Sequence, residues 1–226
     1  MPAANAMTLL DALEQRRSIR GFLPQQVPED VLHSIFSQAQ WAPSNCNVQP
    51  WLVYVASGEC RNELRQRMMD KASNMQPIKP DYDFLPDFSG IYRQRQVDCA
   101  AKLYGEMGIA RDDREGRMRA TLRNFEMFDA PHIAFIGMPR HFGVTVALDV
   151  GMYVQTLMLL MTSYGIGCCA QGSMRYYPDE VRDVFGLSQD TGILLGLSFG
   201  YEDKAVAANR TRVGRAPLSE CVTFKI

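Results

Sequence analysis

Three guanidinium groups and a hydroxyl crowd into five positions of the stretch EQRRSIRGF, residues 14–22: Arg16, Arg17, Ser18 and Arg20. Guanidinium groups are forked donors that suit a phosphate, and a serine hydroxyl adds a neutral donor. Basic residues at a helix C-terminus also stabilise its negative end, and spacing alone favours that interpretation for Arg16 and Arg17. Arg20 lies beyond the expected helix end and two residues after Ser18, so cations and a hydroxyl can converge on one side of a turn.

A second polar cluster, APSNCNVQPW, spans residues 42–51. Two prolines bracket Ser44, Asn45, Asn47 and Gln49 before the chain enters an expected strand. Side-chain amides can match the donor and acceptor edge of a heterocycle. The alternative is a turn without a ligand, which the asparagine and serine side chains stabilise.

Two further stretches could approach a ligand. In YGIGCCAQGSM, Gly172 would let the backbone come close to a bound molecule, although a bulge or a turn also explains a glycine there. In NRTRVGRAPLSE, three cations precede the C-terminal segment: Arg210, Arg212 and Arg215. The alternative for these cations is a solvated basic loop.

The sequence contains none of the motifs G-x-S-x-G, H-E-x-x-H or G-x-x-x-x-G-K-[ST], and no G-x-G-x-x-G follows a strand. Six cysteines without C-x-x-C spacing, and three histidines that form no ligand pair, predict neither a metal site nor a disulfide framework. We therefore expect reduced thiols and a cytoplasmic protein. If the protein is an enzyme, a bound cofactor is expected to supply the reactivity.

Charge and hydropathy argue against two further classes of protein. The formal net charge is −1, whereas a protein that binds nucleic acid carries a basic surplus. The first ten residues, MPAANAMTLL, lack a charged region followed by a long apolar stretch and do not form a signal peptide. The apolar stretch 146–167 contains Asp149, Gln155 and Thr156, which favours a buried core helix over a membrane span.

The periodicity predicts helices and strands in mixed order, without regular βαβ alternation. Helices are expected over residues 7–17, 27–42, 59–72, 91–107, 114–127, 144–164 and 178–185. Strands are expected over residues 51–57, 132–138, 191–201 and 220–226, with a short strand and turn at 167–174. The 226 residues are predicted to form a single α+β domain, 1–226, around one central sheet.

The order and spacing of these motifs, over essentially the whole chain, resemble the FMN-dependent nitroreductase family. The most specific matches are the R-x-S-x-R start at residues 16–20 and the P-S-x-x-N-x-Q-P-W loop at residues 43–51. The resemblance implies FMN as cofactor and NADH or NADPH as electron donor. It also implies a mainly antiparallel central sheet flanked by helices, with a terminal strand exchanged in a homodimer.

The resemblance assigns cofactor binding to four segments of the chain: Arg16, Arg17, Ser18, Arg20, Pro43, Ser44, Asn45, Asn47, Gln171, Gly172, Arg212 and Arg215. The first segment would bind the phosphate and the ribityl chain, with Arg20 at the N1/O2 edge of the flavin ring. The second would reach a flavin that the partner subunit mainly binds. Gln171 and Gly172 would lie beside N5, and Arg215, helped by Arg212, would return to the phosphate.

The implied activity is reduction of nitroaromatic compounds to nitroso and hydroxylamino products with NAD(P)H, by a ping-pong mechanism and without a catalytic acid from the protein. Alternatives within the family are reduction of quinones or other electrophiles, including reductive dehalogenation. Alternatives of another class are a non-catalytic flavin carrier or sensor, or an anion-binding regulatory module. We expect a helical excursion over residues 83–128 to cover the flavin site, with Tyr92 and Tyr104 contacting the acceptor.

Overall fold

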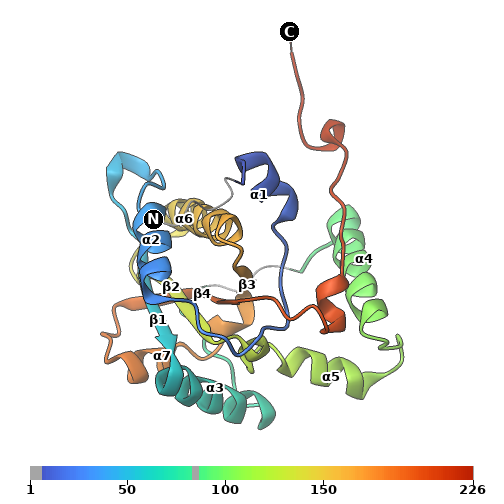
Figure 1. The fold of residues 1–226 in the computed structure, drawn as a ribbon, viewed down its shortest axis with the longest axis horizontal. Helices are drawn as coiled ribbons and strands as arrows, with labels where there is room; N and C mark the ends of the chain where they lie inside the picture. Colours follow the sequence, from blue (N-terminus) through green and yellow to red (C-terminus); the bar gives the residue numbers. More distant parts are fainter. Residues whose placement is uncertain (1–6, 83–86, 226) are drawn as a thin grey trace.

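A four-stranded antiparallel sheet with strand order β1-β2-β4-β3 forms the centre of the structure (Figure 1). The computed structural model describes residues 7–82 and 87–225. The strands of this sheet are β1 (Leu52–Ser57), β2 (His132–Pro139), β3 (Gly167–Gln171) and β4 (Thr191–Gly200). The sheet and its flanking helices confirm the predicted α+β class.

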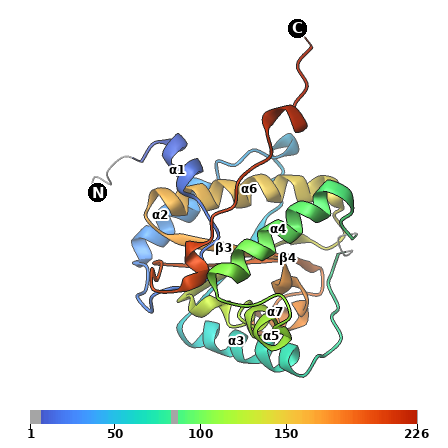
Figure 2. The same cartoon turned by 90° about the vertical axis from the view of Figure 1, so that its right-hand side faces the viewer.

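Helices cover both faces of this sheet (Figures 1 and 2). In chain order they are α1 (Leu9–Gln15), α2 (Glu29–Ala39), α3 (Gly58–Ser73), α4 (Gly90–Glu106), α5 (Arg114–Leu122), α6 (Val144–Ser163) and α7 (Pro178–Phe185). α2 and α6 pack on one face of the sheet, and α3 and α7 pack on the other. α4 lies beside the C-terminal segment.

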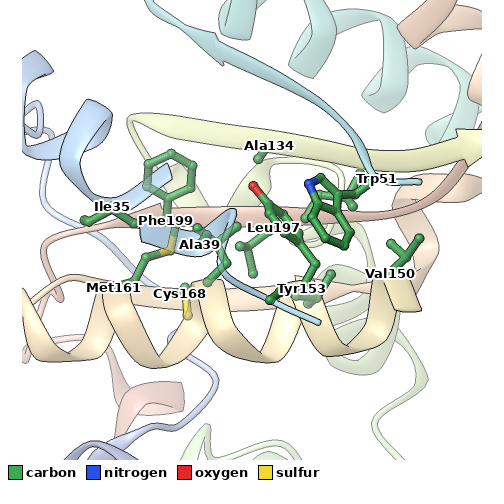
Figure 3. Packing of buried hydrophobic residues seen from close by; sticks show 14 of the residues in the cluster. Ile35, Ala39, Trp51, Ala134, Val150, Tyr153, Met161, Cys168, Leu197 and Phe199 are labelled. Atoms are coloured by element: carbon green, nitrogen blue, oxygen red, sulfur yellow. The ribbon is translucent and has the colours of Figure 1, made fainter. Parts of the chain in front are cut away.

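Strand β2 is buried on both faces and separates two apolar clusters. Ala134 and Ile136 belong to the cluster under α2 and α6, where Tyr153 fills the space between helix and sheet (Figure 3). Ile133 and Phe135 belong to the cluster under α3 and α7. The two-residue period of a strand produces this alternation, and burial on both faces explains why β2 is an uninterrupted apolar run.

Helix α6 could span a membrane by length and composition alone, with a mean hydropathy of 1.6. One face, which includes Asp149 and Tyr153, is buried against the sheet, as predicted for a core helix. The other face is also apolar, because Val144, Leu148 and Met152 recur every four residues and are exposed in the single chain. α6 therefore has a second apolar face that the described part of the chain leaves uncovered.

Local sequence signals fix the bounds of two helices. Thr8 caps α1 through reciprocal hydrogen bonds with Asp11. Pro178 occupies the first turn of α7, and Gly186 ends that helix in the left-handed conformation, at φ 64°. α1 ends at Gln15, slightly before the predicted end at residue 17, so the whole arginine cluster lies outside the helix.

Helix α5 ends at Leu122, earlier than the predicted end at residue 127. Met127, Phe128 and Asp129 instead adopt left-handed backbone angles, with φ between 54° and 63°. This turn lets Met127 and Phe128 enter two different apolar clusters before β2 begins. Burial in two directions therefore overrides the helical periodicity.

The predicted C-terminal strand, residues 220–226, is wrong for the single chain. Residues 222–225 have no regular secondary structure and follow a short 3₁₀ turn (Leu218–Glu220), and residue 226 lies outside the described range. The segment runs away from the sheet and projects beyond the body of the molecule (Figures 1 and 2). A strand needs a sheet edge to pair with, and the segment pairs with no edge in the described part of its own chain.

A buried ion pair anchors the start of the excursion between β1 and β2. Asp81 lies 2.8 Å from Nη1 of Arg182 in α7, and both side chains are almost fully buried. Asp81 also accepts a hydrogen bond from the backbone N–H of Ile193 in β4, and the hydroxyl of Tyr82 donates to the carbonyl of Met138. The excursion therefore leaves the sheet at a fixed point. Residues 83–86, the first of the predicted 83–128 segment, lie outside the described range.

His132 joins three parts of the fold where β2 begins. The backbone N–H of Val27 donates to its Nε2 atom at 3.0 Å, so the proton of the neutral ring lies on Nδ1 and is donated to the hydroxyl of Ser57. The ring is buried and stacks on Phe199 at a centroid distance of 5.1 Å. Burial and the nearby charge of Arg61 lower the pKa of His132 to about 4. The folded chain therefore holds a neutral histidine at any pH well above 4.

We expect His132 to make stability depend on pH between about 6.5 and 4. In that window the unfolded chain binds a proton that the folded chain does not, so the free energy of unfolding falls by about 3 kcal/mol as pH decreases. Urea unfolding at several pH values tests this with His132→Gln, which should flatten the dependence. His33→Gln, a change at an exposed histidine, should leave it intact. An unchanged slope in His132→Gln would contradict the assignment.

Candidate functional site

Five arginines and Ser18 line a single cavity of about 820 Å³. The arginines come from the two ends of the chain: Arg16, Arg17, Arg20, Arg212 and Arg215. The C-terminal end of α6 and the α4 residues Cys99 and Leu103 complete the wall. The structure therefore brings together the first and last of the four segments that the sequence predicted to bind one ligand.

The segment that carries Ser18 and Arg20 runs in extended form beside β3. Ser18 forms a parallel bridge with Cys168, and the backbone N–H of Ile19 donates to the Cys168 carbonyl at 3.0 Å. Ile19 points inward and is buried, so its neighbours face the cavity. Gly167 makes this approach possible, because a Cβ there would lie 2.7 Å from the Ile19 side chain.

Asn209 holds the two arginine-bearing ends of the chain together. Its Oδ1 atom accepts from the backbone N–H of Arg20 at 2.6 Å, and its Nδ2 atom donates to the carbonyls of Gly21 and Asp203. Its own carbonyl accepts from the guanidinium groups of Arg17 and Arg212. The sequence analysis missed Asn209, since one asparagine in a basic loop carries no signal that distinguishes it.

The charge in this cavity is not balanced by carboxylates. Glu202 pairs with Arg17, with Oε1 at 2.6 Å from Nη2, and Glu14 also lines the wall. Within residues 7–82 and 87–225, four of the five arginines have no carboxylate partner: Arg16, Arg20, Arg212 and Arg215. Such a surplus of forked donors is suited to a multiply charged anion such as a phosphate.

The vicinal cysteines lie in β3 behind the arginines. Cys168 and Cys169 are both buried, as expected for small residues in a strand. Burial raises the pKa of the Cys168 thiol to about 12. A thiol in that state is a poor nucleophile, so the chemistry of this site does not come from Cys168.

A second cavity, of about 620 Å³, adjoins the first and shares Arg20 and Leu103 with it. Tyr104 of α4 and Asn124 line it. The structure thus brings Tyr104 close to the arginine cavity, as the sequence predicted for an acceptor contact. Tyr92 is not brought there: it is 64% exposed, has Arg95 over its ring, and lines neither of these cavities.

Gln171, at the end of β3, is buried and engaged at both ends of its side chain. Its Nε2 atom donates to the carbonyl of Asn124 at 2.8 Å, and its Oε1 atom accepts from the hydroxyl of Ser198. Sequence reasoning missed Asn124. A Cβ on the following residue, Gly172, would meet no atom within 4 Å. Gly172 is exposed, but the structure places neither Gln171 nor Gly172 in the wall of the two cavities.

The loop at residues 43–47 lies apart from both cavities of its own chain. Pro43, Ser44, Asn45 and Asn47 line neither cavity, and the loop contacts the N-terminal half of α6 through Asn45 and Asp149. Cys46 and Asn47 have positive φ, at 49° and 57°. Within a single chain, the loop at residues 43–47 therefore lies apart from the cavity that the arginines line.

Comparison with known proteins identifies the family. The model of the Nitroreductase family matches residues 13–201, and the chain belongs to this family. The nitroreductase NfnB of Mycolicibacterium smegmatis is 36% identical, over 99% of this chain and 97% of the relative. The chloronitrobenzene nitroreductase of Comamonas testosteroni is 31% identical over 95% of each chain. The crystal structure of the FMN-dependent nitroreductase NfnB from Mycobacterium smegmatis in complex with NADPH superposes with a TM-score of 0.91, covering 97% of this chain and all of the other.

We expect Asn209→Ala to lower the free energy of unfolding by about 2–4 kcal/mol, because it leaves the Arg20 N–H without its acceptor and removes one of the two donors to the Gly21 carbonyl. Chemical denaturation measures the change. Asn74→Ala is the matched control, since Asn74 is exposed and, among the described residues, its side chain bonds only to the carbonyl of Asp70. The control should change stability by less than about 0.5 kcal/mol. Equal effects from the two substitutions would show that Asn209 does not hold the two segments together.

Proposed function

We propose that the chain is an FMN-dependent oxidoreductase that uses NAD(P)H to reduce nitroaromatic compounds to nitroso and hydroxylamino products. The relatives support the reaction: one is a chloronitrobenzene nitroreductase, and another is an FMN-dependent nitroreductase solved with NADPH. The observation on this chain that carries the proposal is the cavity in which four arginines without carboxylate partners meet Ser18.

The FMN phosphate fits the donors of this cavity. Arg16, Arg212 and Arg215 offer guanidinium groups, and Ser18 adds a hydroxyl. Arg17 plays a different part, because Glu202 and the Asn209 carbonyl already engage its terminal nitrogens. We assign Arg17 to holding the cavity wall, and Arg16, Arg212 and Arg215 to the phosphate.

When bound, FMN supplies hydride-transfer chemistry between a nicotinamide and an acceptor. Arg20 lies where the two cavities meet, and its side chain bonds only weakly, to the Ser18 carbonyl at 3.4 Å. A guanidinium at this place stabilises the negative charge that a flavin ring gains on reduction. NAD(P)H and the acceptor would reach such a ring in turn through these adjoining cavities, which would give ping-pong kinetics, and water would supply the protons.

The smaller cavity is the proposed place of the acceptor. It is lined by Tyr104 and by apolar side chains, including Met107 and Ile109, which suit a flat aromatic molecule. The Tyr104 hydroxyl can donate a hydrogen bond to a nitro oxygen. These residues belong to the excursion 83–128, which is therefore proposed to cover the flavin site.

We also propose that the enzyme is a homodimer. α1, α6, the loop near residue 45 and the C-terminal segment lie toward the top of the molecule in Figures 1 and 2, and each of them carries exposed apolar side chains. They include Leu10, Trp41, Val144, Leu148 and Phe224, with Trp41 90% exposed. A monomer rarely leaves such a surface uncovered. A second copy would cover it, pair with the C-terminal segment, and bring the loop at 43–47 to the other flavin.

The direct test of the activity is anaerobic NADPH oxidation with nitrobenzene as acceptor. The FMN-loaded protein should oxidise NADPH only when the acceptor is present, with parallel double-reciprocal lines, and the protein freed of FMN should not. Parallel runs with NADH give the donor preference. A yellow protein that binds FMN but shows no acceptor-dependent oxidation would be a carrier or sensor and would contradict the proposal.

Tyr104→Ala should change which acceptor is preferred. Loss of one ring contact and one hydrogen bond should shift the ratio of kcat/KM for nitrobenzene to that for a benzoquinone by up to about tenfold. Tyr92→Ala is the matched control and should leave the ratio unchanged, because Tyr92 lies outside both cavities. An unchanged ratio in Tyr104→Ala, at unchanged FMN content, would place the acceptor elsewhere.

Deletion of residues 221–226 should abolish the dimer, because it removes Val222 and Phe224 from the apolar surface. Light scattering of the full chain should give the mass of two copies, and the shortened chain should aggregate or lose FMN. A soluble, FMN-loaded monomer from the shortened chain would count decisively against the dimer.

A further inference from the structure

Asp149 is a carboxylate buried on the packed face of α6, with only 6% of its surface exposed. In the described part of the chain it has one hydrogen-bond donor, the backbone N–H of Asn45, at 3.2 Å from Oδ2. A buried carboxylate weakens a fold unless its partners compensate for lost hydration. Its presence amid the apolar cluster under α6 therefore calls for a function other than packing.

The loop that Asp149 contacts is strained. Cys46, Asn47 and Gln49 all have φ in the left-handed region, at 49°, 57° and 50°. Asparagine adopts this region fairly readily, whereas cysteine and glutamine do so at a cost in free energy. Such a conformation persists only where the surroundings impose it, and strained loops of this kind cluster at ligand sites.

The hydrogen bonds of the loop are nearly all internal. The Ser44 hydroxyl accepts from the backbone N–H of Gln49 at 2.9 Å, and the Gln49 side chain donates to the Asn47 carbonyl at 3.0 Å. Among the hydrogen bonds of residues 44–49 within the described chain, the one from Asn45 to Asp149 alone reaches the body of the protein. Asp149 thus fixes where the loop stands on α6.

Helix α6 also fixes the far end of the loop. Trp51 stacks on Tyr153, one turn after Asp149, with ring centroids 4.8 Å apart (Figure 3). Between these two anchors the side-chain amides of Asn45 and Asn47 are exposed. The Asn45 amide has only a weak contact with the Cys46 sulfur, and the Asn47 amide has no partner within the described residues. The backbone is held while two amide groups stay free to bind.

We propose that Asp149 is a positioning residue that holds the loop at residues 44–49 in its ligand-binding conformation, so that the Asn45 and Asn47 amides meet the flavin of the second copy. This inference rests on the proposed function. It implies that the carboxylate serves cofactor binding at the expense of stability, because an apolar residue of similar size would suit the α6 interface better. Stability and FMN affinity should therefore respond in opposite directions when Asp149 is replaced.

The test compares Asp149→Leu and Asp149→Asn with the parent, in the full chain and at a protein concentration where light scattering gives one mass for all. Fluorescence titration with FMN and thermal unfolding of each protein are the two readouts. Asp149→Leu, which has no acceptor, should weaken FMN binding by about tenfold or more and should unfold at the same or a higher temperature. Asp149→Asn keeps an acceptor oxygen and should restore most of the affinity.

Thr156→Val is the matched control, because within residues 7–82 and 87–225 the Thr156 hydroxyl bonds only to the Met152 carbonyl of the same helix. It should leave FMN affinity unchanged. The inference is overturned if Asp149→Leu keeps the parent's FMN affinity, if it loses stability and affinity together, or if it fails to fold. It is also overturned if Asp149→Asn loses as much FMN affinity as Asp149→Leu. A parent protein that binds no FMN would instead refute the proposed function, so the two failures are distinguishable.

Discussion

The hydrogen bonds of Asn209 are the constraint on which the site depends. They join segments 188 residues apart in the chain and set Arg17 and Arg20 opposite Arg212. Guanidinium groups in one cavity repel each other, and a neutral amide with a carbonyl can hold them without cancelling their charge. Glu202 neutralises Arg17 alone. The result is a cavity that is positively charged and already organised before a ligand arrives.

Helix α4 lines both cavities and makes ion pairs with the chain that follows β4. It has no buried residue in the single chain, although Leu103 contributes to both cavities. Glu106 near its C-terminal end pairs with Arg210 at 3.1 Å, and Arg95 pairs with Glu220 at 2.6 Å. Both partners belong to the stretch at residues 210–220, which also carries Arg212 and Arg215. The same stretch thus carries two arginines of the larger cavity and pairs with the helix that also lines the smaller one.

Much of the fold could be predicted from local signals, because those signals act over a few residues. Pro178 and Gly186 mark the two ends of α7, and the apolar run of β2 indicates a strand that is buried on both faces. The strand predicted for the C-terminal segment was wrong for the single chain, because a strand needs a sheet edge and the segment pairs with none in the described part of the chain. The predicted end of α5 was wrong because Met127 and Phe128 pack into two different apolar clusters.

The candidate site likewise contains residues that could be predicted from the sequence and residues that could not. The types and spacing of the arginines and of Ser18 indicated that these side chains converge, and the structure places them in one cavity. Asn209 and Asn124 could not be predicted, because an asparagine acquires such a role only through backbone groups that the fold brings to it. Tyr92 and Tyr104 were indistinguishable by sequence, as their difference lies in which side of α4 faces Arg20.

The central claim, that the arginine cavity binds the phosphate of FMN, is tested most directly by comparing FMN with riboflavin, which has the same ring and ribityl chain but no phosphate. The protein freed of flavin is titrated with each at low and high salt, with flavin fluorescence as the readout. The account predicts that FMN binds about a hundredfold more tightly or better, and that salt weakens FMN binding but hardly affects riboflavin. Equal affinity for the two flavins would contradict it.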